Sequence, residues 1–208
     1  MGAPGYTTPL RPDTFQKLVL NAGIMLKDFD YSAISSVSAM KTAINNAISG
    51  TSTLGTILGA TRGGGSFTVT RELRQPDVDG RRYGFKGDTF VDSMDAQIAT
   101  TLVEITPDNM LTTFATGTSS TTGNVEVLKV GTAIDTDDYL TNVCWVGDVA
   151  GGGYMLICLK NALNEADVNI TWTDKGEATL PVEFHAKQAN VGDYDYAPFE
   201  IVYLSPST

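Results

Sequence analysis

Residues 65–105 read GSFTVTRELRQPDVDGRRYGFKGDTFVDSMDAQIATTLVEI, and this stretch decides which fold we expect. Apolar and polar residues alternate towards both ends, which is typical of two strands that each bury one face. Between them lies a charged loop with three glycines, residues 74–88. The pattern predicts a long β-hairpin with a protruding loop. Such a hairpin is longer than a small β domain needs for its own core, so we expect it to reach another subunit.

The remaining sequence predicts further strands and two helices. A short helix at about 107–116 follows Thr106, a good N-cap residue, and starts with Pro107, which suits the first helical turn. Apolar residues spaced three to four apart predict a second helix at about 36–48. The fold class is therefore expected to be mainly β, a β-sandwich or barrel-like domain with a short flanking α-helix. Further strands are predicted at 17–26, 125–130, 139–147, 154–160, 168–173, 180–187 and 199–203.

The composition indicates one domain, residues 1–208, with an unusual region near its start. Residues 31–65 are rich in Ser, Thr, Ala and Gly, and we interpret them as an inserted loop or arm region. We expect its part from 51 to 65 to be an irregular arm that becomes ordered on a neighbouring molecule. The net charge of −10 argues against a surface that grips phosphates. The apolar runs are too short for a membrane span, and the first residues lack a signal-peptide pattern, so we expect folding in a cytoplasm.

The two cysteines fall in a predicted hairpin centred on Gly151, which places Cys144 directly opposite Cys158. The apolar residues on both faces of this hairpin predict either a central position or cover by a partner. Adjacent antiparallel strands strain a disulfide, and the expected compartment is reducing. We therefore predict packed free thiols.

No catalytic or metal-binding pattern is found. His185 is the only histidine, it lies on the polar side of a predicted strand, and no nucleophile motif accompanies it. One histidine and two cysteines cannot form a zinc site with familiar spacing. The sequence therefore predicts a protein that is not an enzyme and that has no catalytic, metal or cofactor site.

The predicted hairpin supplies the candidate residues for contacts between subunits. Its basic residues make up five of the 14 Lys and Arg in an acidic chain. They fit either a tip held by internal salt bridges or a basic tip that docks on the acidic surface of an identical neighbour. The candidates for the subunit interface and for a channel wall are Phe67, Thr68, Val69, Thr70, Arg71, Arg74, Arg81, Arg82, Lys86, Asp95, Gln97 and Thr101.

Several collinear segments resemble the tail tube (major tail) proteins of long-tailed bacteriophages, especially those of Gram-positive hosts. The likeness is weakest over residues 32–56, because the region rich in Ser, Thr and Ala before Gly59 is longer here than in that family. The segments that carry it are LNAGIMLKDF (20–29), GATRGGGSFTVTRE (59–72), GD (87–88), LVEITP (102–107), GGGY (151–154), LKNAL (159–163), LPVEF (180–184) and APFEI (197–201).

This resemblance implies a structural virion protein. Hexameric rings would stack into a hollow tail tube, assembled in the host cytoplasm, with two long hairpins from each subunit joining neighbours into a β-barrel around the channel. The implied partners are further copies of the chain, the tape measure protein in the lumen, and the tail completion or terminator and distal tail proteins. DNA would pass without specific binding. The alternative is a β-sandwich adhesin or carbohydrate-binding module, which would present Trp172, Tyr194 and Tyr196 on one face.

Overall fold

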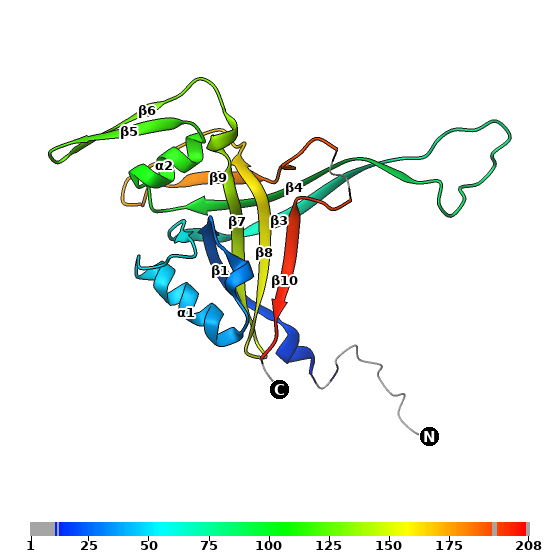
Figure 1. The fold of residues 1–208 in the computed structure, drawn as a ribbon, viewed down its shortest axis with the longest axis horizontal. Coiled ribbons are helices and arrows are strands. Elements are labelled where there is room, and N and C mark those ends of the chain that lie inside the picture. Colours follow the sequence, from blue (N-terminus) through cyan, green and yellow to red (C-terminus); the bar gives the residue numbers. More distant parts are fainter. Residues whose placement is uncertain (1–10, 12, 193–194, 207–208) are drawn as a thin grey trace.

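A computed structural model describes residues 11, 13–192 and 195–206 and shows a mainly β fold (Figure 1). Its α-helices are α1 (Val37–Ile48) and α2 (Pro107–Phe114), and its 3-10 turns are η1 (Thr14–Lys17), η2 (Tyr31–Ala33) and η3 (Thr136–Asp138). Its strands are β1 (Val19–Lys27), β2 (Thr56–Ile57), β3 (Thr61–Arg74), β4 (Phe90–Leu102), β5 (Gly117–Thr122), β6 (Val125–Val130), β7 (Leu140–Val149), β8 (Gly153–Asn164), β9 (Leu180–His185) and β10 (Phe199–Leu204).

The strands form two main antiparallel layers that share β8. Sheet A has the order β2-β1-β7-β8-β10, and sheet B continues from the end of β8 through β9 and β4 to β3. In Figure 1 the strands of sheet B cross those of sheet A at a steep angle. β5 and β6 pair only with each other and form a separate ribbon beside α2. The arrangement is sandwich-like, as the sequence predicted.

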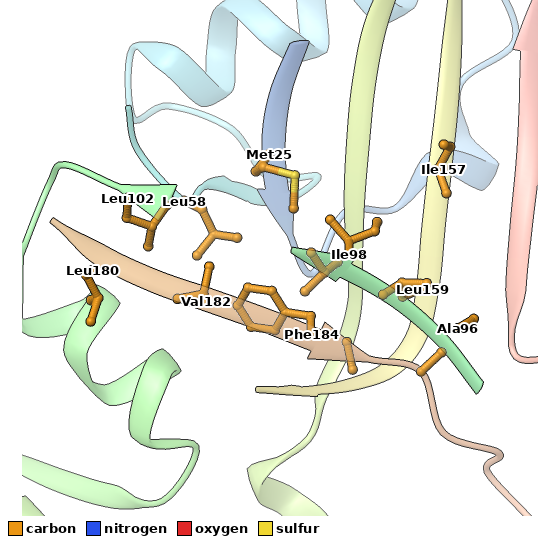
Figure 2. Close-up of a cluster of buried hydrophobic side chains, with 13 residues drawn as sticks. Met25, Leu58, Ala96, Ile98, Leu102, Ile157, Leu159, Leu180, Val182 and Phe184 are labelled. Carbon is orange, nitrogen blue, oxygen red and sulfur yellow. The ribbon is translucent and has the colours of Figure 1, made fainter. Parts of the chain in front are cut away.

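The main core lies between the two sheets (Figure 2). Met25, Ile157 and Leu159 from sheet A meet Ile98 and Phe184 from sheet B. Alternate residues of each strand supply this layer because successive side chains point to opposite faces. Phe184 is completely buried, and truncating a core Phe to Ala costs about 3–5 kcal/mol.

A second core lies on the opposite face of sheet A, beneath α1. Leu26 and Leu156 alternate with residues of the main core and pack against Met40 of the helix. Small Ala43 and Ala47 on the same helix are also buried. Residues of the same chain therefore cover both faces of the β7–β8 hairpin. Of the two interpretations of its apolar faces, the central position is the one that the structure shows.

The region predicted to be an inserted arm, residues 31–65, carries α1, and packing on sheet A orders this helix within its own chain. The helix spans Val37–Ile48, and the Ser36 side chain accepts a hydrogen bond from the Ala39 amide at its start. The predicted helix at 36–48 is confirmed. The rest of the region contains η2, irregular segments and the two-residue strand β2 at the edge of sheet A. Its last residues, 61–65, were expected in an irregular arm but form the start of β3, because they lie along β4.

The prediction of free thiols is wrong. The register of β7 and β8 places Cys144 opposite Cys158, as expected, but the two sulfurs form a disulfide. The Cα atoms of this pair are 4.1 Å apart and both side chains are completely buried. Directly opposed strand positions come closer than most other residue pairs, and here that proximity brings the sulfurs together.

Two further differences from the sequence prediction concern α2 and residues 168–173. α2 begins at Pro107 behind the N-cap Thr106, as predicted, but ends at Phe114 because Ala115 adopts a left-handed conformation with φ 61°. The strand predicted at 168–173 is absent. That segment forms only an isolated bridge between Thr171 and Thr179.

Candidate assembly surface

The outer part of the β3–β4 hairpin lies beyond the rest of the molecule. β3 and β4 pair from Thr61 opposite Leu102 to Arg74 opposite Phe90, but β9 pairs with β4 only over its residues Gln97–Leu102. Figure 1 shows the hairpin continuing away from the body. We call residues 71–94 the distal hairpin.

The distal hairpin has two strand edges that lack a partner in the described part of the chain. β3 is the last strand of sheet B, and no strand within the described ranges pairs with its outer edge. On β4, the backbone contact between the Ala186 amide and the Ala96 carbonyl, 2.9 Å, is the last with the segment after β9. Residues 90–95 continue beyond this point with strand pairing to β3 only, while residues 186–188 and 195–198 line a pocket together with 91–95. Free edges of this kind pair readily with strands of other chains.

Large apolar side chains cover the distal hairpin. Leu73 and Val91 face each other across the ladder and are 59% and 53% exposed. In the loop, Tyr83 and Phe85 are 80% and 69% exposed. The sequence interpretation stressed the charges of this loop and missed its apolar residues, although these stand out as isolated aromatic residues among charges and glycines. Large exposed apolar patches are typical of interaction surfaces, so these residues are further candidates for a subunit contact.

The loop at the tip is held in shape by its own polar contacts. Arg81 forms a short ion pair with Asp88 and donates to the Pro76 carbonyl oxygen. The Phe85 amide donates to Asp88 Oδ2 at 2.7 Å. This hydrogen bond, together with the charge of Arg81, holds the pKa of the Asp88 carboxyl below its usual range. The two side chains are only 16% and 18% exposed, so a protruding loop has a small polar core of its own.

The basic candidates divide into two groups. Arg81 is internal to the loop, and Arg74 Nε lies 2.8 Å from Asp92 Oδ2, so these two support the interpretation of a salt-bridged tip. Arg71, Arg82 and Lys86 are exposed and form no ion pair within the described ranges. They remain candidates for docking on an acidic neighbour.

The outward face of sheet B gathers most of the polar candidates. Thr68 lies opposite Gln97, and Thr70 lies opposite Asp95, all on the side away from the core. Thr101 follows on the same face of β4. These side chains form a polar stripe across the sheet, as the alternation predicted.

The two apolar candidates on β3 point the other way. Phe67 and Val69 pack against the main core, and the Phe67 ring meets Phe199 edge-on with ring centroids 5.4 Å apart. They belong to the core side of the sheet rather than to its polar face.

His185 connects β9 to this polar stripe. Its Nδ1 lies 2.9 Å from Asp95 Oδ2, and its Nε2 lies 3.1 Å from Glu183 Oε1. An ionised carboxylate only accepts hydrogen bonds, so each of these two contacts is a hydrogen bond when the ring nitrogen that it involves carries a proton. Burial alone would lower the pKa of His185, but Asp95, Glu183 and the nearby Glu165 outweigh it and raise the pKa above its ordinary value. Glu183 and Glu165 are members of this cluster that the sequence interpretation missed.

A second exposed ribbon lies on the far side of α2. β5 is exposed along its whole length, and Val125, Val127 and Val130 of β6 are each close to half exposed or more. A two-stranded ribbon is marginally stable alone, so it gains from a further contact. α2 itself is tied to sheet A by Lys27, whose Nζ lies 2.6 Å from Asp108 Oδ2.

The aromatic residues of the adhesin interpretation lie in separate places. Trp172 is 76% exposed and adjoins the bridge at Thr171, just before β9 begins. Tyr196 is 82% exposed, and its carbonyl accepts from Gln188, beyond the end of β9. Tyr194 falls outside the described residues.

No family model matches the chain, and no curated protein matches it in sequence. Among residues 11, 13–192 and 195–206, no His, Cys, Asp and Glu side chains form a group of three or more that could hold a metal ion. No helix within those ranges has the length and hydropathy needed to cross a bilayer.

Proposed function

We propose that this protein is a tail tube subunit of a long-tailed bacteriophage, which polymerises as stacked hexameric rings into a hollow conduit for DNA. The observation that carries the proposal is the distal hairpin, which has two free strand edges and exposed apolar side chains outside the core. A strand from a second copy would satisfy the backbone groups along such an edge.

The two edges are different surfaces, which favours rings over simple pairs. If the free edge of β3 in one copy meets residues 90–95 of β4 in the next, every copy uses one edge of each kind. Repeating a head-to-tail contact of this sort around a rotation axis closes a ring and removes its exposed edges. A continuous sheet around a channel would result.

The polar face of sheet B is the surface that we assign to the lumen. Its threonines carry no charge, and Asp95, Glu183 and Glu72 supply acids near them. Six copies of a chain with net charge −10 carry a total of about −60, and acids lining the lumen would repel phosphates. DNA would then pass without adhering. The tape measure, tail completion and distal tail proteins are the further partners that this function entails.

Shortening the hairpin tests the proposal. Glu72 and Ser93 are opposite each other in the ladder, so an Asn-Gly turn can replace the residues between them. We expect purified wild-type protein to form rings or tubes in negative-stain micrographs at high concentration. The shortened protein should stay folded, by circular dichroism, and monomeric, by light scattering.

Tubes formed by the shortened protein would contradict the assignment of the hairpin. A wild-type protein that stays monomeric at every concentration and binds glycans would support the carbohydrate-binding alternative instead.

A further inference from the structure

Sheet B covers only part of the inner face of sheet A. On β10, Phe199 packs against Phe67 of sheet B, but Ile201 and Tyr203 follow on the same face and are 44% and 67% exposed. They pair with Ile157 and Met155 of β8, which belong to the main core and its rim. The core layer of sheet A therefore continues as an open apolar strip where sheet B ends.

A cavity adjoins this strip. It has a volume of about 180 Å³ and lies between the first part of β3 and the middle of sheet A. Met25, Phe67, Ile98, Trp145 and Ile157 provide most of its apolar lining. Ile157 lines the cavity and is the cross-strand partner of Ile201, so the exposed strip begins beside the cavity. A cavity of this kind is large enough for an aromatic ring, since an apolar cavity of about 150 Å³ binds benzene.

The chain cannot fill this cavity with its own hairpin tip. Gly65 and Phe67 line the cavity at the base of the hairpin, whereas the tip begins after Arg74. Phe67 and Arg74 are seven positions apart along an extended strand, a distance of about 23 Å. The paired strands hold the tip away from the body in Figure 1. An aromatic side chain that fills the cavity must therefore come from another molecule.

The tip of a second copy has the chemistry for this role. Phe85 is 69% exposed, and its backbone is fixed by the hydrogen bond to Asp88. A loop that is already ordered loses little entropy on binding. Residues 71–88 hold five of the 14 Lys and Arg but only four of the 24 Asp and Glu, so this segment is positive and the rest of the chain is strongly acidic. Electrostatic attraction between the positive tip of one copy and the acidic remainder of another favours their encounter.

We propose that the uncovered end of sheet A, with the cavity beside Trp145, receives Phe85 from the hairpin tip of a second copy of this chain. The inference rests on the proposed function, because it names the surface that each tip meets during assembly. Donor and acceptor sites differ, so the contact is head-to-tail and can propagate through a ring or between rings.

Cysteine cross-linking tests this contact directly. Phe85→Cys protein carrying a size tag is mixed with untagged Ile201→Cys protein and mildly oxidised, and cross-linked dimers are measured on non-reducing gels. The matched control replaces Ile201→Cys by Trp172→Cys, whose site is at least as exposed. We expect at least tenfold more mixed dimer with Ile201→Cys. Equal yields from both mixtures would overturn the proposal.

A second measurement uses Phe85→Ser and Phe85→Leu. The first should raise the protein concentration needed for assembly about tenfold or more, which corresponds to a loss of about 1.4 kcal/mol per contact. Leu should restore most of it, and both variants should unfold at the wild-type temperature. If wild-type protein forms tubes but the Ile201→Cys mixture matches its control, this docking fails and the proposed function stands. If no tubes form but the cross-link is enriched, the docking stands and the tube function fails.

Discussion

Replacing Leu73 and Val91 together by Thr tests whether the distal hairpin is an interface. The two residues are opposite each other and lie outside the core, and Thr keeps a high strand propensity. Exposed substitutions of this kind change the free energy of unfolding by roughly 0.5 kcal/mol or less each. The folded monomer should therefore be unaffected, with an unchanged midpoint in urea.

Assembly should respond much more strongly. Burying a Leu or Val side chain completely contributes about 1.5–3 kcal/mol, and slightly more than half of each is still exposed in the monomer. Covering both in a subunit contact is therefore worth about 2–3 kcal/mol, which predicts association about 30–150-fold weaker in the variant.

The assay is the lowest protein concentration at which sedimentation and electron microscopy detect assemblies. Ile134→Thr with Val191→Thr is the matched control, because these aliphatic side chains are 52% and 104% exposed outside the hairpin. The control should assemble like the wild type. An equal threshold for the wild type, the hairpin variant and the control would refute the reasoning.

Four further predictions concern the stability and the proposed lumen. Asn142→Ala removes the side chain that bonds both the amide and the carbonyl of buried Phe29, so the free energy of unfolding should fall by about 2–4 kcal/mol in urea titrations; a loss below about 1 kcal/mol would contradict this. Folding raises the pKa of His185, so protonated His185 adds to the free energy of unfolding fully below its ordinary pKa of about 6.5, and this addition is lost as the pH rises through the pKa of the folded state. His185→Gln should remove this loss of stability from the pH profile measured in urea titrations. A variant with the same pH profile as the wild type would count against the prediction. Alkylation of the unfolded chain without reductant should leave Cys144 and Cys158 unlabelled, whereas labelling of both would restore the free-thiol interpretation. Virions built with Glu72→Lys and Glu183→Lys should eject DNA more slowly, and unchanged ejection kinetics would argue against an acidic lumen.

Local patterns were sufficient to predict most strands and both helices. The turn at Gly151 fixed the register of β7 and β8, because the length of a hairpin loop sets which residues of the two strands lie opposite each other. Thr106 and Pro107 marked the start of α2 through caps that act within one turn. Such signals depend only on neighbouring residues, so a single sequence contains them.

The failures concern contacts between distant segments. Residues 168–173 alternate like a strand, but pairing needs a partner that the sequence does not reveal. Phe67 and Phe85 are both aromatic residues of one hairpin, yet one packs in the core and the other is exposed, since β9 and sheet A cover only the base. The cluster around His185 likewise joins Asp95 to β9 across 90 positions of sequence. The polar stripe was predictable from alternation. The exposure of the apolar tip and of the open strip of sheet A depends instead on how far the opposite sheet extends, which alternation does not reveal.

The sharing of β8 between both sheets has a mechanical consequence. β9 bonds to Leu163 and Asn164, while the preceding residues of the same strand are held between β7 and β10. A pull on the hairpin is therefore passed along one covalent backbone into the other layer, which the buried disulfide cross-links to its neighbouring strand. The two layers cannot slide past each other without breaking several strand pairings at once. In a polymer of such units, bending would be accommodated at the joints between molecules, and each subunit would behave as a stiff link.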